Sequence, residues 1–271
     1  MLNLVLVPAA AEPIFHIGSF PVTNALINGW IAAGFFVGLA FMLRSRSALV
    51  PTGVQNAAET VVEAALGEVQ KVTGDRERAL RFLPIVGTLF VFILFSNWIG
   101  LLPGSGSVGM WQVHGGENLL VPVMRAATSD LNFTLAIALF AVLASHLFGL
   151  RAVGLGTHVG RFIQIPGLIR SFSKGPMAVM VALIEFAVGL LEIVSEFAKV
   201  VSLSLRLFGN VFAGEVLLTV MLGIFAYGLP IPFLFLELLV GIIQATVFAM
   251  LTLAYLTVMT TPPSHGEEGA H

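Results

Sequence analysis

The sequence of 271 residues contains no cysteine and few charged side chains. Without cysteine, disulfide bonds, thiolate catalysis and thiolate metal sites are excluded. Charged residues make up 10% of the chain and hydrophobic residues 57%, whereas a soluble domain carries about 25% charged residues. The mean hydropathy of +0.97 reflects the same imbalance. So few charges cannot cover a water-facing surface, and the composition therefore predicts an integral membrane protein.

The apolar residues form continuous runs rather than an alternating pattern, which predicts membrane helices and not a barrel. The expected fold is all-α, with about five membrane-embedded helices and one amphipathic surface helix. The predicted spans are residues 22–43, 82–102, 131–150, 177–226 and 233–259. The fourth run contains no proline, and as one helix it would measure about 75 Å against a hydrocarbon core of about 30 Å. We expect it to be steeply tilted or bent and to form a long hairpin with the last helix.

The segments between the runs give the expected topology of one membrane domain. Charged and apolar residues interleave over 51–81, which indicates an amphipathic helix on the membrane surface. Six basic residues lie within 44–81 and four within 151–174, and the positive-inside rule places both segments in the cytoplasm. The segments expected outside are 1–21 and the glycine-rich loop 104–130, and those expected in the cytoplasm are 51–81, the connector 151–174 and the tail 260–271.

Ionisable residues interrupt the fourth run, where each costs at least about 2.5–3.5 kcal/mol if it faces lipid at mid-bilayer. Four of them repeat every seven residues and so share one helix face: Glu185, Glu192, Lys199 and Arg206. Structural ion pairing remains open for this row, for example Glu192 or Glu196 with Lys199 at helical spacing. Arg206 is different, because an arginine cannot be neutralised by a shift of its pKa and must stay charged in the membrane.

A second polar face follows beyond Arg206. Glu215 lies on the opposite side of the helix from Arg206. On the last helix, Glu237 and Gln244 are seven residues apart, with Gly241 between them, where the missing side chain allows another backbone or water to approach. Titratable carboxylates beside a permanent cation are what proton transfer with a barrier against leakage requires.

Four segments resemble subunit a of the F-type ATP synthase. The strongest is SLRLFGNVFAGE from Ser204 to Glu215, which is similar to the signature of that family. SNWIGLLP from Ser96 to Pro103, DLNFTL from Asp130 to Leu135, and the segment from Gln244 to Leu256 resemble other parts of it. Together the similarity covers roughly residues 82–256.

The resemblance implies a role for each matching residue. Arg206 would face a ring of c subunits, each with one membrane carboxylate. The residues expected to line the aqueous half-channels are Asn210, Glu215, Glu237 and Gln244. Residues expected to have a secondary role, either lining the channels or on the cytoplasmic side, are Glu192, Glu196, Lys199, Ser202, Asn97 and Asp130. The family often has one acid and one histidine where this chain has Glu215 and Glu237, so which carboxylate relays the proton stays open. Some members carry Asp where this chain has Gly100.

The resemblance also implies the mechanism and the partners. Protons would enter one half-channel from outside, ride the rotating ring and leave by the other, with Arg206 between the two paths. The expected partners are the c-ring, the b-subunit peripheral stalk, the remaining synthase subunits and the lipid bilayer, with no nucleic acid and no cofactor. The chain itself would not be a catalyst. We expect the protein to lie in a bacterial inner membrane. The translocated ion is expected to be H⁺, and Na⁺ remains open.

An independent transporter or an intramembrane enzyme is the alternative. Either would need a nucleophile, metal ligands or broken helices at mid-membrane, and the sequence indicates none of these. The GxGxxG match at 104–109 follows a span and opens no βαβ unit, so it indicates a loop. His114, His146 and His158 lie on separate expected elements and do not suggest a metal site.

Overall fold

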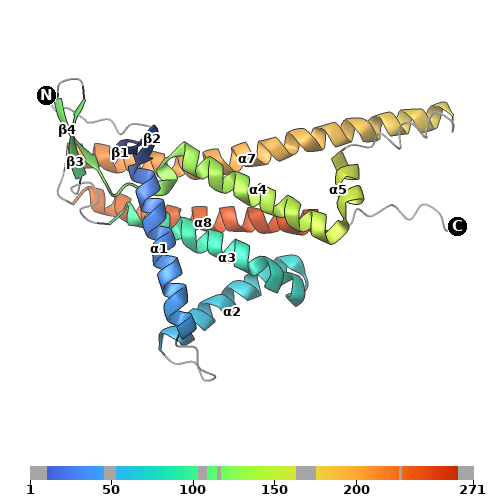
Figure 1. Cartoon of the computed structure of the whole chain (residues 1–271), viewed down its shortest axis with the longest axis horizontal. Coiled ribbons are helices and arrows are strands. Elements are labelled where there is room, and N and C mark those ends of the chain that lie inside the picture. The colour runs from blue at the N-terminus through green and yellow to red at the C-terminus, as the bar shows by residue number, and fades with distance from the viewer. Residues whose placement is uncertain are drawn as a thin grey trace. The chain divides into compact units, whose positions relative to one another are not determined.

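The computed structural model describes residues 11–45, 53–102, 109–114, 117–162, 175–225 and 228–261. Five of its helices are long and apolar enough to cross a membrane. They are α1 (Asn24–Ser45), α3 (Arg76–Ile99), α4 (Leu131–Val153), α7 (Pro176–Ile224) and α8 (Pro230–Thr260) (Figure 1). The expected all-α membrane fold is thus confirmed. Parts of the predicted N-terminus, of the loop 104–130, of the connector and of the tail lie outside the described residues.

The amphipathic segment expected over 51–81 is two elements rather than one. Helix α2 (Val54–Thr73) ends at Gly74, whose φ of +71° is a left-handed conformation that glycine adopts without strain. Asp75 then caps α3, and its carboxylate accepts hydrogen bonds from the backbone N–H of Glu77 (3.3 Å) and Arg78 (3.1 Å). The second span helix therefore begins at Arg76, before the apolar run at 82, with a charged first turn.

The glycine-rich loop expected over 104–130 contains a β-hairpin. Strand β3 (Gly109–His114) pairs antiparallel with β4 (Glu117–Pro122), and a short 3-10 helix, η2 (Ala127–Ser129), leads into α4. A second hairpin, β1 (Pro13–Ile17) with β2 (Phe20–Thr23), precedes α1. The sequence predicted only a glycine-rich loop here and no strands. Strand pairing satisfies the backbone hydrogen-bonding groups of these residues.

The described residues fall into two compact units. Unit 1 takes its residues from 1–137 and 203–251, and unit 2 from 138–202 and 252–271. Helices α4, α7 and α8 contribute to both. In unit 1, Gly29 of α1 packs on Phe133 of α4. A Cβ at position 29 would lie only 2.7 Å from the Phe133 ring, so a larger residue would not fit there. Unit 2 also contains the short helix α5 (Leu155–Phe162).

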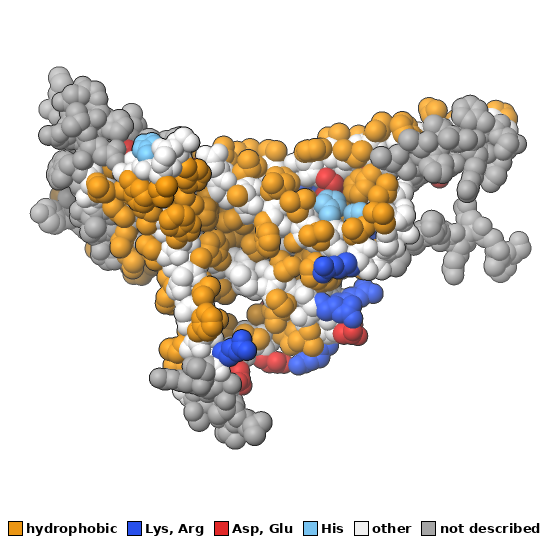
Figure 2. Space-filling view, in the orientation of Figure 1, with side chains coloured by type: hydrophobic (Ala, Val, Ile, Leu, Met, Phe, Trp, Pro, Cys, Tyr) orange, Lys and Arg blue, Asp and Glu red, His pale blue; other side chains and the backbone are white. Residues whose placement is uncertain are grey.

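Most of the apolar surface of α7 is exposed. In an apolar stretch of 18 residues within α7, only 11% of the residues are buried. Large side chains that are at least 50% exposed include Met177, Leu191, Val194, Phe197 and Leu205. Figure 2 shows hydrophobic side chains over much of the visible face, whereas charged side chains gather over α2 and the start of α3. Such a surface requires lipid or another protein to cover it.

Candidate functional site

Arg206 lies on the exposed side of α7 in unit 1. Its neighbours Leu203 and Leu207 are 2% and 1% exposed and fix the buried side of the helix. Arg206 and Asn210, one helical turn later, are both exposed. Helix α7 thus buries an apolar stripe within the unit and presents the arginine and the asparagine at its surface.

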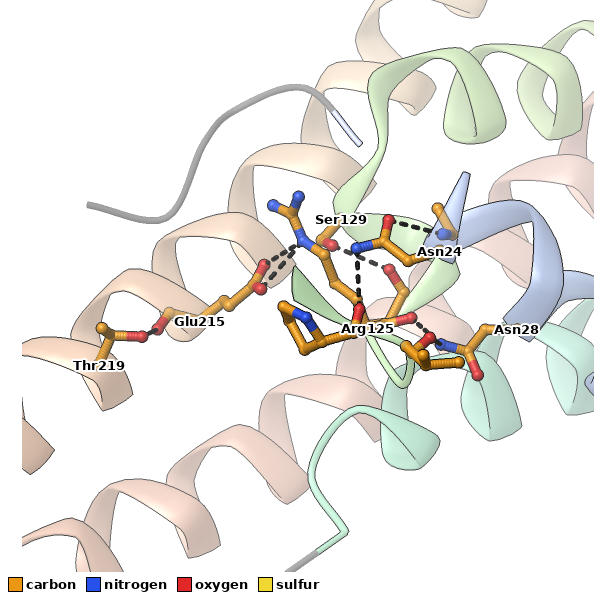
Figure 3. A network of polar contacts seen from close by, with 10 residues as sticks. Asn24, Asn28, Arg125, Ser129, Glu215 and Thr219 are labelled. Atoms are coloured by element: carbon orange, nitrogen blue, oxygen red, sulfur yellow. Dashed lines mark hydrogen bonds and ion pairs between the residues drawn. The ribbon is translucent and has the colours of Figure 1, made fainter. Parts of the chain in front are cut away.

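Glu215 forms an ion pair with a residue that the sequence did not single out. Arg125 Nε lies 3.0 Å from Oε1 and 3.1 Å from Oε2 of Glu215 (Figure 3). The Arg125 side chain is 2% exposed and that of Glu215 is 27% exposed. A buried guanidinium needs a counter-ion because it cannot shed its proton. The Glu215 carboxylate provides that negative charge.

Two asparagines on α1 position the segment that carries Arg125. Asn28 Nδ2 donates to the Arg125 carbonyl, and Asn24 Nδ2 donates to the Pro122 carbonyl at 3.2 Å (Figure 3). Both asparagines are fully buried, so their hydrogen bonds to the loop are formed away from water. The hairpin β3–β4 and helix α1 together direct Arg125 toward α7.

Asn97, expected to line a channel, joins three elements of unit 1. Its Nδ2 donates to the Gly241 carbonyl on α8 at 3.4 Å, and its Oδ1 accepts from Thr128 Oγ1 at 2.5 Å. Trp98 Nε1 also donates to α8, at the Leu238 carbonyl (3.3 Å). A Cβ on Gly241 would lie 3.3 Å from the Trp98 ring. The missing side chain therefore lets α3 approach the α8 backbone.

Glu237 packs against the backbone of α7. It is 8% exposed, and a Cβ on Gly214 would overlap its carboxylate. Among the residues that the structure describes, no cation lies within ion-pair distance of this carboxylate. Gln244, one heptad further along α8, is also 8% exposed. Glu237 and Gln244 are therefore buried polar groups on α8, while Glu215, next to Gly214, is held by Arg125.

Asp130 and Gly100 have structural settings at the end of the loop. Asp130 caps α4, since its Oδ1 accepts from the Asn132 N–H at 3.0 Å and its carbonyl from the Thr134 N–H at 3.1 Å. Gly100 packs so closely on the loop that a Cβ would lie 2.9 Å from the backbone nitrogen of Ala126. An aspartate there would displace the segment that holds Arg125.

The remaining candidates lie in unit 2. Of the two pairings left open, the structure forms Glu196 with Lys199, with Nζ 2.5 Å from Oε1. Glu192 is partly exposed, and Glu185 and Ser202 are exposed. His146 of α4 also reaches Glu196, with Nε2 3.3 Å from Oε2.

Two of the three histidines considered separately in the sequence come together. His146 Nδ1 lies 3.3 Å from His158 Nε2 on α5, whereas the side chain of His114 is outside the described ones. The described residues contain no group of three metal-ligating side chains.

The residues that sequence reasoning missed are Asn24, Asn28, Arg125, Thr128, His146 and His158. A signal existed for Arg125, the one basic residue of the loop 104–130.

Most of the chain is similar to known proteins of one family. A family model described as "ATP synthase A chain" matches residues 26–257. ATP synthase subunit a of Moorella thermoacetica is 31% identical over 243 residues, which cover 90% of this chain and 93% of the relative. Subunit a of Mycobacterium ulcerans is 35% identical over 86% of this chain and 85% of its own length. ATP synthase subunit a 2 of Bradyrhizobium sp. is 29% identical over 92% of this chain and 94% of its own length.

Proposed function

Since the chain belongs to the ATP synthase subunit a family, we propose that its polar residues line two offset half-channels for protons. The chain is an integral multi-pass membrane protein that mediates proton translocation in an F-type ATP synthase. Through that translocation the proton gradient drives ATP synthesis. We assign the ATP chemistry to other subunits and give this chain a non-catalytic role in the stator.

Arg206 is the observation that carries the proposal. It is a permanent cation at a largely apolar exposed surface of α7, where its exposed neighbours include Val201 and Leu205 as well as the polar Ser202 and Asn210. A charge on such a surface is stabilised by a partner that brings a carboxylate, and a c-ring with one membrane carboxylate per subunit fits that requirement. The same cation forces each passing carboxylate to be ionised, so it prevents a proton from crossing directly between the half-channels.

The entry half-channel follows the buried polar groups of unit 1. Glu237 and Gln244 of α8, with Asn97 of α3 against them, provide proton-exchanging or hydrogen-bonding groups. Glu215 shares this region but is tied to Arg125. Protons arriving from outside pass these groups, protonate a ring carboxylate near Arg206 and Asn210, and are carried round by rotation. Each charge that crosses the membrane contributes about 2.3 kcal/mol per 100 mV, so several protons are needed for each ATP.

The exit half-channel lies on the cytoplasmic side, where the residues of unit 2 contribute. Glu196 and Lys199 are its paired charges, and Glu192 and Ser202 are at the surface of α7. The basic residues around α2 and after α4 support a cytoplasmic location for this side and an external N-terminus. We propose the inner membrane of a bacterium, and partnership with the c-ring, the b-subunit stalk and the other synthase subunits.

ATP-driven proton pumping in inverted vesicles of the assembled complex tests this function. Arg206→Ala is expected to assemble and to abolish pumping, because the barrier between the half-channels is lost. Arg81→Ala is the matched control, since Arg81 is an exposed arginine in an ion pair with Glu77 on α3 (2.5 Å), and it should pump normally. Normal pumping by Arg206→Ala would overturn the barrier role. Adding Na⁺ at fixed pH tests the ion, since proton pumping should be insensitive to it.

A further inference from the structure

A cluster of titratable side chains in unit 2 joins Glu196 and Lys199 to two histidines that the family resemblance does not supply. Four helices contribute to it: His146 from α4, His158 from α5, Glu196 and Lys199 from α7, and Tyr255 from α8. The Lys199 ammonium lies 2.5 Å from Glu196 Oε1 and 5.0 Å from the centre of the Tyr255 ring. Because Lys199 holds one carboxylate oxygen, the other oxygen is left to face His146.

The His146 ring bridges Glu196 and His158. Its Nε2 lies 3.3 Å from Glu196 Oε2, and its Nδ1 lies 3.3 Å from His158 Nε2. A neutral imidazole carries a donor on one nitrogen and an acceptor on the other, so it can take a proton on one side and release one from the other. Both ring nitrogens of His146 are engaged in such contacts, which makes a continuous line of three titratable groups.

Close helix packing fixes this line. A Cβ on Gly149 of α4 would lie 2.8 Å from the Met259 carbonyl and 3.1 Å from His158 Cε1. A Cβ on Gly189 of α7 would lie 2.6 Å from the Phe162 carbonyl at the end of α5. Glycine at these two positions allows α4, α5, α7 and α8 to approach closely enough for the rings to meet.

Among the described residues, Arg161 is a second cation near the cluster, and its hydrogen bonds go to the end of α8. Its Nη1 donates to the Val258 carbonyl at 3.2 Å, and its Nη2 donates to the Thr261 carbonyl. These are carbonyls at the C-terminal end of α8, where a positive charge is favourable. Arg161 therefore anchors α5 on α8 and leaves Glu196 to His146 and Lys199.

We propose that Glu196, His146 and His158 form a proton relay that releases protons from the exit half-channel to the cytoplasm. This proposal rests on the proposed function. A proton that reaches Glu196 passes to His146 Nε2, while His146 Nδ1 gives its proton to His158 Nε2. His158 then gives the proton on Nδ1 to a water molecule that reaches this nitrogen, so that one proton enters and one leaves. Both rings turn over before the next proton moves in the same direction. In the opposite tautomers the same line carries protons inward when the complex hydrolyses ATP.

The surroundings of His158 suit the last group of a release path. Its ring is 8% exposed. Burial lowers the pKa of His158, and the nearby His146 and Arg161 lower it further, while Glu196 opposes them. A histidine that is neutral at cytoplasmic pH accepts a proton only briefly. Its Nδ1 has no hydrogen-bond partner among the described residues and is the ring nitrogen not used by His146. Because this nitrogen is also buried, release requires a water molecule to reach it.

The relay is tested in the assembled synthase by passive proton conduction through vesicles stripped of the catalytic sector and by ATP-driven pumping. Three variants keep the size of each group and remove its titration: His146→Gln, His158→Gln and Glu196→Gln. We expect each to slow conduction about tenfold, less than the roughly 10²–10⁴ typical of a positioned acid or base, because water still supplies a slower path. His16→Gln, which changes an exposed histidine of β1, is the matched control and should conduct normally.

Chemical rescue separates a relay from a structural support. Imidazole added to His146→Ala vesicles should restore conduction in proportion to its concentration and should shift the pH profile toward that of the native protein. Conduction equal to native in all three glutamine variants would overturn the relay. So would slow conduction with an unchanged pH profile and no rescue, which marks a structural role. If His146→Ala does not assemble, the pH profile of His146→Gln decides the question.

The same vesicles distinguish this proposal from the proposed function. Arg206→Ala should abolish coupled pumping altogether, whereas the relay variants should slow it and remain coupled. If Arg206→Ala is inactive and the relay variants are native in rate, only the relay is wrong. If Arg206→Ala pumps normally, the proposed function is wrong and the relay falls with it.

Discussion

Glu215 and Glu196 are two carboxylates on one helix, and each has a basic partner, but the partners differ in kind. Glu215 faces Arg125, a buried guanidinium that keeps its proton at any physiological pH. Glu196 faces His146 and Lys199, and a neutral imidazole has a donor on one nitrogen and an acceptor on the other. A permanent cation fixes a carboxylate in place, whereas an imidazole offers it a route for protons.

The same comparison applies within unit 1, between Glu215 and Glu237. Glu215 holds the segment before η2 to α7 through Arg125, and Arg125 is in turn positioned by Asn28. Glu237 is buried against Gly214, with no cation at ion-pair distance among the described residues. We therefore expect the unpaired carboxylate to exchange protons and the paired one to position the loop.

The largest effect expected from this comparison of carboxylates is on pumping, when Glu237 loses its charge. Glu237→Gln should lower ATP-driven pumping by at least about tenfold, because it removes a proton-exchanging group. Glu215→Gln should leave more activity, because its main contribution is to hold Arg125. Glu63→Gln, in an exposed ion pair with Arg76, is the matched control. If Glu215→Gln proves the more severe of the two, the assignment of the two carboxylates must be reversed.

Removing Arg125 should destabilise the outer loop more than it affects proton exchange. Arg125→Ala leaves Glu215 without its counter-ion, and the loss of one partner of a buried ion pair costs roughly 3 kcal/mol. The double variant with Glu215→Gln should recover part of that loss, since no unpaired carboxylate then remains. Proteolysis of the loop 104–130 in right-side-out vesicles measures the loosening. Strictly additive effects of the two substitutions would show that the pair is not coupled.

Sequence reasoning succeeded for features that depend only on the spacing of residues along the chain. The spans follow from the length of the apolar runs, and the Glu196–Lys199 pair follows from helical spacing. The close approach at Gly241 could also be anticipated, because a glycine between two polar residues of a helix leaves room for a neighbour. The neighbour itself, Asn97 of α3, could not be identified in this way.

Contacts between distant elements escaped prediction for a physical reason. Arg125 and Glu215 are 90 residues apart, and Asn97 and Gly241 are 144 apart. Periodicity fixes which side of a helix a residue occupies but not which helix faces that side. His146 and His158 meet because the chain turns at Gly154, whose φ of +85° suits glycine. The basic character of the connector gave no indication of that turn.

The smallest expected effect is a pH dependence of stability that comes from His158. The folded-state pKa of His158 is lowered, chiefly by burial, so the unfolded chain binds more protons once the pH falls below the ordinary value of about 6.5. The stability due to the buried neutral ring is therefore present above pH 6.5 and is lost as the pH falls through the folded-state pKa.

Thermal unfolding of the purified complex at a series of pH values measures this effect. Between pH 7 and pH 5 the native protein should lose roughly 2–4 °C more in Tm than His158→Gln does. His16→Gln is the control, because its ring is exposed, and it should follow the native curve. Parallel curves for the native protein and His158→Gln would mean that His158 titrates alike in the folded and unfolded chains.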